Sequence, residues 1–504
     1  MKKFLSLILS IILIFTMAIP AFAADTVKQT CPTIYIHGFM GSKICENKND
    51  ISTKYTFPSG DEILEPVKNE LLPALLTYIA TDNGEPFAYK LCEIVNGMFE
   101  GYFNNPDGTA KGNSGSYMPY PSAKSITATS NLEFIYDWRG DPFEIAADLN
   151  DFIDYVLEHS GAEKVALRCH SLGSVIGTTY LTVYGSGKVM GIVFDSAALL
   201  GVTYVGELLC GNPQFAGDAL TRGFKDLLSE NEYNELISGA LDILEIAGIT
   251  DDAGRFLNEL IQKIAPILYK ETLVPLFAHW PTAWAMTPDK YIDEGMEYIF
   301  NSYCTGEEYE TLKRKIEKYN KEVRATKYDT LRSFDENGRM AVIARYGYGA
   351  LPVSPSWDVL TDTVVDTKHA SLGAETATVG TSFNSEYLEG KDMSLISPDR
   401  TVDASTCLFP EKTWFIKNIK HDRSDITKPL HEGLLFGEEE ATVENYEALS
   451  RFMIFDAETE ILSEDNSEYK EPIEENEKVS VFVKVMKFFT ALFEFITNLL
   501  KDKK

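Results

Sequence analysis

The segment 164–173 carries a serine in a setting that suits covalent catalysis. It reads Lys-Val-Ala-Leu-Arg-Cys-His-Ser-Leu-Gly, so an apolar run that predicts a strand leads into Ser171 and then into a helical pattern. A serine at a sharp strand-to-helix turn is a nucleophile elbow, which needs small residues two positions before and two positions after the serine. Gly173 meets this need, whereas Cys169 replaces the first glycine. We expect Ser171 to be the nucleophile of an acyl transfer.

A glycine-rich turn upstream offers donors for the oxyanion that acyl transfer creates. Residues 33–42 read Thr-Ile-Tyr-Ile-His-Gly-Phe-Met-Gly-Ser, a buried strand followed by a turn. Backbone N–H groups fixed in such a turn can bind the negative oxygen. We therefore assign the oxyanion hole to the amides of Phe39 and Leu172, the second being the residue after the nucleophile.

The orienting acid is expected after the serine and before the base. Residues 361–366 read Thr-Asp-Thr-Val-Val-Asp and follow a predicted strand at 340–345 and its loop. Asp362 is the first choice for the acid and Asp366 the second. Either aspartate could instead stabilise a turn or cap a helix, as is common in a threonine-rich loop.

The base is expected in the loop after the last strand, predicted at 413–419. His421 and His431 both qualify, and the sequence leaves the choice between them open. We favour His431 as the base, with His421 as the alternative, because a residue that leads toward a closing helix at 443–454 can reach back over the sheet edge. The remaining histidine is then a surface or loop residue.

The elements that must position these residues alternate between short apolar runs and helical patterns. Such alternation predicts a mostly parallel sheet covered by helices on both faces. A helix opened by Pro142, with an apolar side from Ile145 to Val156, joins the second predicted strand to the third as a βαβ unit. The predicted strands are 33–36, 132–135, 165–168, 190–194, 340–345 and 413–419.

Two long segments interrupt the alternation and set the expected domain organisation. Residues 44–127 are polar and turn-rich around a few helical stretches, and 199–338 are helical in pattern, as at 224–246 and 309–323. We expect a core in two parts, 24–198 and 339–455, with 199–338 inserted as a helical cap. A cap can control access to an apolar pocket; a purely structural insertion is the alternative.

The two ends of the chain have compositions of their own. Residues 1–23 have a basic start, an apolar stretch and a small-residue end, which predicts an export signal. Residues 456–478 are rich in acidic residues and predict a linker. In 479–504 the polar residues recur on one narrow helical stripe, which predicts an amphipathic helix at a membrane or lipid surface; packing on the protein itself or on a second subunit is the alternative.

Charge and cysteine content narrow the classes of function. The formal net charge is -30, so nucleic acid is not an expected partner. The seven cysteines include no Cys-x-x-Cys pair, so neither a disulfide scaffold nor a thiolate metal site is expected. Cys169 is expected to be a free buried thiol, and a bridge from Cys45 to Cys92 is conceivable.

At these residues the chain resembles the lecithin:cholesterol acyltransferase family of lipases, phospholipases and acyltransferases, within the α/β-hydrolase superfamily. The resemblance rests on the turn 37–44, the segment Phe-Ile-Tyr-Asp-Trp-Arg at 134–139, the elbow and the acid turn. The family's entry into the last helix looks like His-Glu-Gly-Leu-Leu at 431–435, although the acid turn lacks the usual glycine.

The resemblance implies an α/β-hydrolase fold and a serine hydrolase that cleaves carboxylic esters of lipids. The export signal implies secretion, and the C-terminal helix could hold the protein at the outer face of the cell membrane. Ser171, His431 and Asp362 would act as nucleophile, base and acid, with no metal and no organic cofactor. The alternatives are an O-acyltransferase, a carboxylesterase for small esters, and a noncatalytic surface-binding protein that kept the fold.

Overall fold

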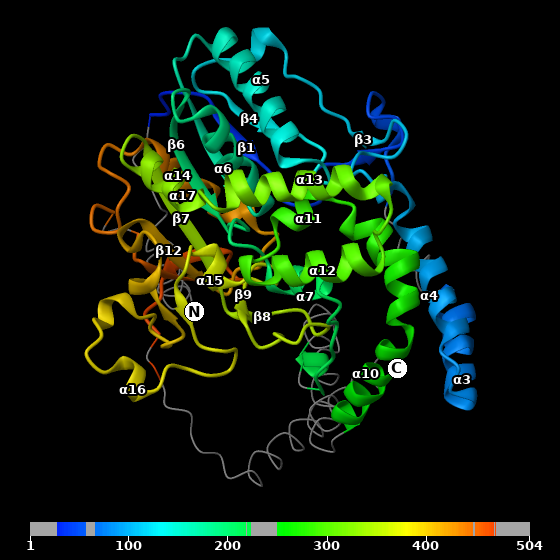
Figure 1. Cartoon of the computed structure of the whole chain (residues 1–504). Coiled ribbons are helices and arrows are strands. Elements are labelled where there is room, and N and C mark those ends of the chain that lie inside the picture. Colours follow the sequence, from blue (N-terminus) through cyan, green and yellow to red (C-terminus); the bar gives the residue numbers. More distant parts are fainter. Residues whose placement is uncertain are drawn as a thin grey trace, which may run out of the picture.

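A mostly parallel sheet forms the centre of the computed structural model, which describes residues 28–56, 66–217, 219–222, 249–446, 449–467 and 469 (Figure 1). The strand order is β14-β13-β12-β7-β6-β5-β1-β4. Every neighbouring pair is parallel except β13 and β14. All six predicted strands are formed. The strands are β1 (Thr33–Ile36), β4 (Asn131–Phe134), β5 (Val165–His170), β6 (Val189–Asp195), β7 (Arg339–Tyr346), β12 (Thr413–Lys417), β13 (Phe452–Asp456) and β14 (Ile461–Glu464).

Side chains on successive strand residues point to opposite faces of this sheet, as the pleat requires. On β5, Val165, Leu167 and Cys169 enter the core cluster that also contains residues of α5 (Pro142–Ser160) and α6 (Leu172–Tyr184). Ala166, between them, enters the cluster that contains leucines of α17 (Ser424–Phe436). Helices therefore cover both faces, with α17 on the face opposite α5 and α6.

Helix α5 shows how local sequence sets an element. Asp141 caps its start by accepting a hydrogen bond from the Phe143 amide (2.9 Å), and Pro142 occupies the first helical turn. Gly161 ends the helix at φ 70°, a conformation that glycine adopts without steric cost. The predicted βαβ unit is thus formed.

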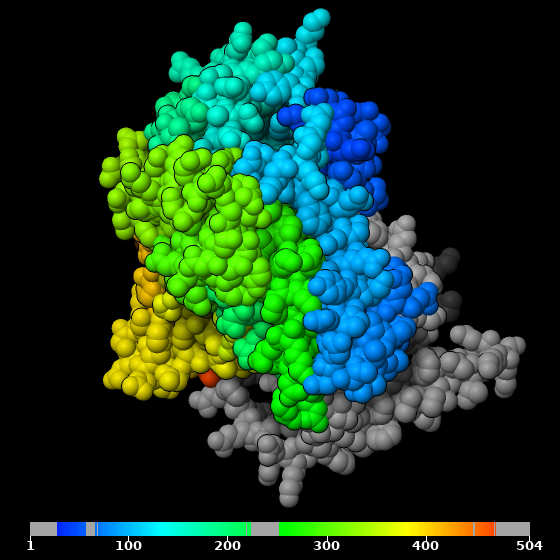
Figure 2. Space-filling model, turned by 45° about the vertical axis from the view of Figure 1, so that its right-hand side comes forward, coloured from blue at the N-terminus to red at the C-terminus, as the bar shows by residue number. Residues whose placement is uncertain are grey.

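The segment expected as a cap lies between β6 and β7, and its described residues are mostly helical, with short loops such as 210–216 and 303–306. Outside the core, α3 (Leu72–Thr81) and α4 (Glu85–Met98) pack beside α10 (Ile249–Leu268) around a small separate apolar cluster that includes Tyr78, Phe87 and Ile264. Figure 2 shows these segments, in blue and green, side by side. The cap helices are α7 (Thr203–Leu209), α10 (Ile249–Leu268), α11 (Pro281–Ala285), α12 (Ile292–Ser302), α13 (Glu310–Tyr319) and α14 (Lys327–Asp335).

Apart from short 3-10 helices, the remaining described helices and strands are short or lie in the insertions. They are α3 (Leu72–Thr81), α4 (Glu85–Met98), α15 (Thr367–Ala370), α16 (Ser385–Leu388), the π-helical segments Val67–Leu71, Tyr269–Ala278 and Asn320–Arg324, and the strands β2 (Ile44–Cys45), β3 (Gly115–Ser116), β8 (Tyr348–Gly349), β9 (Leu360–Thr361), β10 (Glu375–Thr376) and β11 (Val402–Asp403).

Several expectations about the C-terminal third need correction. The closing helix predicted at 443–454 is not formed, because residues 452–456 instead extend the sheet as β13. The last core helix is α17, which begins earlier. Part of the predicted linker 456–478 forms β14, whose backbone pairs with β13. Cys45 and Cys92 are both free thiols, so the bridge between them is absent.

Other predicted segments cannot be compared with the structure. The export signal, the helix at 224–246 and the amphipathic helix at 479–504 lie outside the described residues. Within the described ranges, no helix is both long and apolar enough to cross a membrane.

Candidate active site

Ser171 stands at the turn from β5 into α6 in a strained backbone conformation. Its φ of 53° and ψ of -122° lie outside the regions that a serine normally occupies, and such strain is typical of a nucleophile elbow. The backbone is held on both sides: its amide donates to the carbonyl of Asp195 (3.1 Å), and its carbonyl accepts from the amides of Ser174 (3.0 Å) and Ala198 (3.2 Å). Ser171 is only 2% exposed.

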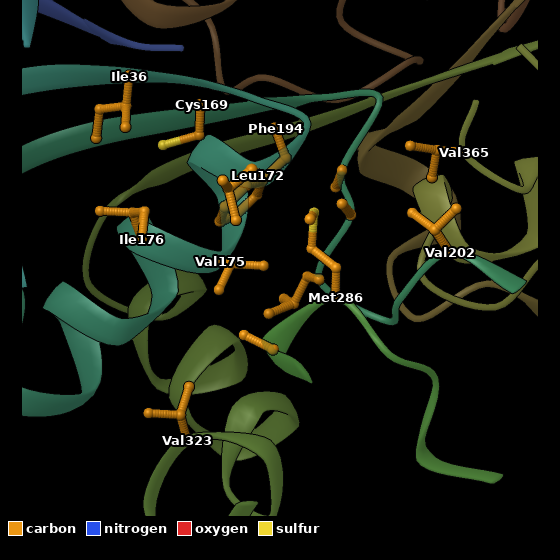
Figure 3. Packing of buried hydrophobic residues seen from close by; sticks show 14 of the residues in the cluster. Ile36, Cys169, Leu172, Val175, Ile176, Phe194, Val202, Met286, Val323 and Val365 are labelled. Carbon is orange, nitrogen blue, oxygen red and sulfur yellow. The ribbon is translucent and has the colours of Figure 1, made fainter. Parts of the chain in front are cut away.

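The elbow is closely packed, which explains the small residues around the serine. A Cβ on Gly173 would lie 2.1 Å from the carbonyl oxygen of Ile36, so only glycine lets α6 approach the end of β1. The unexpected Cys169 has room for its sulfur because Gly177 faces it from α6; a Cβ there would lie 2.7 Å from Sγ. Figure 3 shows Cys169 against α6, near Ile36 and Ile176.

The predicted oxyanion turn lies against the serine. A Cβ on Gly38 would be 2.7 Å from the Ser171 Cβ and 3.2 Å from its Oγ. The Tyr136 hydroxyl donates to the His37 carbonyl (2.6 Å) and so fixes the start of the turn. The amides of Phe39 and Leu172 donate no hydrogen bond to any described residue, so both remain available to a ligand.

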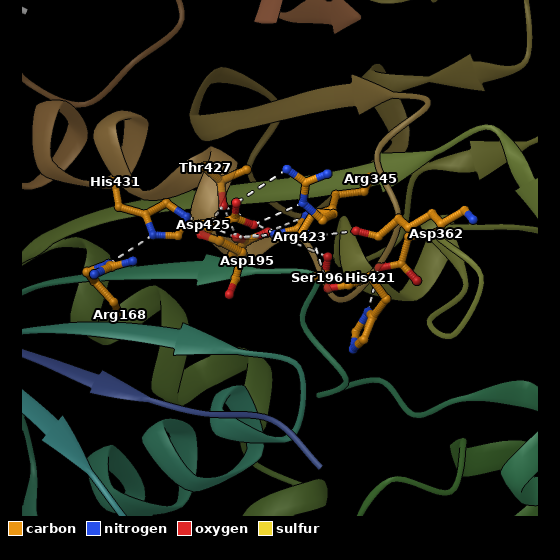
Figure 4. Close-up of polar contacts among 12 residues, drawn as sticks. Arg168, Asp195, Ser196, Arg345, Asp362, His421, Arg423, Asp425, Thr427 and His431 are labelled. Carbon is orange, nitrogen blue, oxygen red and sulfur yellow. Dashed lines mark hydrogen bonds and ion pairs between the residues drawn. The ribbon is translucent and has the colours of Figure 1, made fainter. Parts of the chain in front are cut away.

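Asp362 is paired with His421. His421 Nδ1 lies 2.7 Å from Asp362 Oδ2, and the His421 amide donates to the Asp362 carbonyl (2.9 Å). The second carboxylate oxygen, Oδ1, accepts from the amides of Val364 (3.0 Å) and Val365 (2.8 Å). The carboxylate is therefore fixed by its own turn, and it holds the histidine at Nδ1 (Figure 4).

The environment keeps Asp362 ionised. Burial raises the pKa of this carboxyl, but the His421 imidazole, Arg345 and the Val365 amide favour the charged form more strongly, so the pKa is lowered below 3.8. An ionised carboxylate at Nδ1 selects the tautomer that carries its proton there. Nε2 of His421 then has a free lone pair, and it makes no hydrogen bond to a described residue.

His431, the favoured base, is not brought together with Asp362. It lies within α17, where Nε2 contacts Asp195 Oδ2 (3.0 Å) and Nδ1 accepts from Arg168 Nε (3.0 Å) (Figure 4). Since Arg168 can only donate, Nδ1 must be unprotonated and Nε2 must carry the hydrogen. Both ring nitrogens are thus engaged, and burial lowers the pKa of His431, although Asp195 opposes this. The side chain is 1% exposed, against 14% for His421.

Asp366, the second choice of acid, serves other groups. Its Oδ2 accepts from the Thr203 amide at the start of α7 (2.8 Å) and contacts His369 Nδ1 (3.0 Å). This aspartate therefore joins its own loop to the cap. Asp362 is the one that the structure pairs with a histidine after β12.

His170 connects the two halves of the site. It precedes Ser171, and its ring centroid lies 4.8 Å from that of His421. Burial is the main cause that lowers the pKa of His170 well below 6.5, and the nearby His421 adds to the effect. The His170 ring therefore stays neutral beside the Asp362–His421 pair. This tilted ring contact places the His421 loop beside the residue that leads into the serine.

Three buried charged residues near the site were missed from the sequence. Arg168, Asp195 and Arg345 lie on the neighbouring strands β5, β6 and β7, all on the α17 face. Each of these residues interrupts an apolar run. Because side chains alternate along a strand, each could have been assigned from the sequence to the same buried face as the apolar residues two positions away. Among the described residues, no group of three or more His, Cys, Asp or Glu side chains is arranged to hold a metal.

A mostly parallel sheet with a strained serine between strand and helix, and with a carboxylate and a histidine after later strands, is the α/β-hydrolase fold. No family model and no curated protein matches the chain.

Two solved structures are distantly similar to the chain. One belongs to the crystal structure of the Tle4-Tli4 complex, with 17% identity and a TM-score of 0.20 over 36% of this chain and 48% of that one, so the chain spans about half its length. The other is a bromoperoxidase from Bacillus anthracis, with 13% identity and a TM-score of 0.19 over 68% of this chain and 79% of that one. We assign the fold from the strand order and the strained turn at Ser171, and not from these distant similarities.

Proposed function

We propose that the protein is a serine hydrolase that cleaves carboxylic esters, with Ser171 as nucleophile, His421 as base and Asp362 as orienting acid. The observation that carries the proposal is the Asp362–His421 pair (2.7 Å), formed in the loops after β7 and β12 and next to the elbow. This assignment replaces His431 with the alternative that the sequence left open.

The chemistry follows from the protonation states. His421 Nε2 takes the proton of the Ser171 hydroxyl as Oγ attacks the ester carbonyl, and the imidazolium is stabilised by the Asp362 carboxylate. The oxyanion is bound by the amides of Phe39 and Leu172. His421 then returns the proton to the leaving alcohol, which departs and leaves an acyl-enzyme on Ser171. Water, activated by the same base, releases the acid and restores the serine.

Apolar groups beside the oxyanion turn support lipid esters as substrates. Phe39 and Met40 are 37% and 43% exposed, and Phe39 packs on Trp138 and Trp280 with ring centroids at 4.5 and 5.7 Å. Exposed apolar side chains next to a catalytic turn favour substrates that bring an apolar chain. The cap elements that flank them would then control entry. Export and contact with a lipid surface through 479–504 belong to this proposal on sequence grounds.

A fluorophosphonate probe tests the proposal directly. Such a reagent labels an activated serine, so we expect one equivalent of label on the full chain and none on Ser171→Ala. The serine variant should also lose hydrolysis of p-nitrophenyl esters of short and long acids, with an unchanged unfolding transition. Labelling of Ser171→Ala at the parent rate, or parent-level turnover by it, would refute the nucleophile. A preference for long acyl chains would support lipid esters.

A further inference from the structure

The residues of the buried Asp195–Arg345 ion pair form hydrogen bonds to the backbone of the nucleophile and of the base. Asp195 ends β6, and its backbone carbonyl accepts the amide hydrogen bond of Ser171 (3.1 Å). Its carboxylate accepts from Arg345 through two parallel bonds, Nε to Oδ1 (2.9 Å) and Nη2 to Oδ2 (2.7 Å). One residue therefore holds the nucleophile by its backbone and an arginine by its side chain.

Arg345 extends this connection to the base. Its Nη1 donates to the carbonyls of Lys420 (2.8 Å) and His421 (3.0 Å), the two residues that shape the turn carrying the imidazole. Its own carbonyl accepts from the Thr367 hydroxyl (3.0 Å), in the segment that follows the acid turn. Figure 4 shows Arg345 between Asp195 and the His421 loop.

Helix α17 completes the surroundings of the carboxylate. The Thr427 hydroxyl donates to Asp195 Oδ2 (2.6 Å), and His431 Nε2 contacts the same oxygen (3.0 Å). Arg345 and Asp195 are fully buried. Burial raises the pKa of Asp195, but Arg345 and His431 outweigh it and hold the pKa well below 3.8. The pair is thus charged and fully hydrogen-bonded.

We propose that the Asp195–Arg345 pair is a positioning clamp that sets the placement of His421 relative to Ser171. This inference rests on the proposed function. A buried ion pair is weak evidence for stability, since apolar residues of similar volume often stabilise as well. What apolar residues cannot replace is the set of directed bonds from Arg345 to the two carbonyls of the base loop. His431, which resembles a catalytic base in sequence, supports the clamp through Asp195.

Substitutions at Arg345 can separate positioning from stability. Arg345→Met removes the guanidinium group and all of its hydrogen bonds. Arg345→Lys keeps the positive charge but cannot bond to Asp195 and to both loop carbonyls at once. We expect kcat on a soluble short-chain ester to fall about a hundredfold in Arg345→Met and about tenfold in Arg345→Lys, because a displacement of about 1 Å costs rate on this scale. KM should stay within about threefold, and the rate of fluorophosphonate labelling should fall in step with kcat. Asp195→Asn should behave like Arg345→Lys.

Arg324 provides a matched control in the cap. It is also a buried arginine, bound to Asp289 (2.8 Å) and to the carbonyls of Thr287 (2.6 Å) and Trp284 (2.7 Å), with no contact to the base loop. Arg324→Met should lower the melting temperature while kcat of the folded enzyme stays within about twofold of the parent. Each variant is measured on the full chain, with kcat referred to the folded fraction.

The outcomes are distinct. If Arg345→Met and Arg324→Met both lower the melting temperature and both keep parental kcat, the pair is structural and the clamp is refuted. If KM rises while kcat is kept, the clamp is refuted as well. If Ser171→Ala remains active, the proposed function fails first, whatever the arginine variants do. Loss of kcat in Arg345→Met with retained KM, beside an active Arg324→Met, supports the clamp.

Discussion

At the scale of single residues, the two histidines that follow β12 present the same sequence signal but different chemistry. His421 has one nitrogen on a carboxylate and the other free, as a base requires, whereas His431 has both nitrogens engaged. The number of free ring nitrogens decides between them. That number depends on partners far away in the sequence, such as Arg168 and Asp195.

Substituting each histidine distinguishes the two roles. We expect His421→Ala to lose about a thousandfold in kcat/KM, as removal of a base from an interdependent triad does. His431→Ala should lose far less, and His431→Gln less still, because a glutamine amide can donate to Asp195 and accept from Arg168. Steady-state hydrolysis of a soluble ester measures the ranking, and a larger loss in His431→Ala would return the base to His431.

The sequence predicted the parts of the site that depend on local pattern. The strained turn at Ser171 was recognised as a strand that leads through small residues into a helix, and the glycine turn as a strand followed by glycines. The structure places the two turns next to each other. From the sequence, the histidine that pairs with Asp362 could be narrowed only to His421 or His431. Choosing between them needed the bend after β12, which no short pattern encodes.

At the scale of elements, the long apolar runs were predicted well, whereas β13 and β14, at one edge of the sheet, were not predicted. The central strands of the sheet are continuous buried runs, and such runs are readable without knowledge of their neighbours. Strand β13 is short and follows a loop, and its residues also fit a helical pattern, so the prediction of a helix at 443–454 failed. Only pairing with β12 makes it a strand.

The contact between β5 and α6 offers a test of this packing. Gly177→Ala should destabilise the protein by about 1 to 3 kcal/mol, because its Cβ would lie 2.7 Å from the Cys169 sulfur in a filled core. Adding Cys169→Gly should recover most of that loss, since the two positions share one space. Urea unfolding of the two single variants and the double variant measures the coupling; strictly additive effects would show that sulfur and Cβ do not compete.

At the scale of the whole molecule, buried histidines tie stability to pH. Burial lowers the pKa of His37 to about 4, and it also lowers the pKa values of His170, His279 and His431. A histidine in the unfolded chain has a pKa of about 6.5, so below that pH the unfolded chain binds protons that the folded protein does not. Stability from these residues is present above pH 6.5 and is lost as the pH falls toward their folded pKa values.

The contribution of one histidine can be isolated. We expect the difference in unfolding free energy between the parent and His431→Gln to shrink as the pH falls from 7 to 5, by at most about 1.4 kcal/mol per pH unit. Urea titrations at pH 7, 6 and 5 measure it. A difference that grows as the pH falls would mean that His431 is charged in the folded protein.

Under the proposed function, we expect the strongly acidic body and the C-terminal segment to make opposite contributions at a lipid surface. The net charge of -30 repels anionic lipids, whereas an apolar face in 479–504 would bind them, with its lysines offsetting part of the repulsion. Deleting residues 479–504 should leave turnover of a soluble ester within about twofold, weaken sedimentation with vesicles and slow hydrolysis of emulsified ester. Equal vesicle binding, or joint loss of stability and soluble-ester activity, would contradict the membrane role.

The contact between Cys169 and Gly177 also affects how nucleophile elbows can be found by sequence pattern and how their residues change among homologous chains. The usual five-residue pattern asks for glycine two positions before the serine and so passes over this chain. Space at that position is shared with the facing helix, so a larger residue before the serine is tolerated where position 177 is glycine. We expect the two positions to change together among homologous chains. A bulky residue at one should be matched by glycine at the other, and a pattern that spans both would detect elbows that the shorter pattern misses.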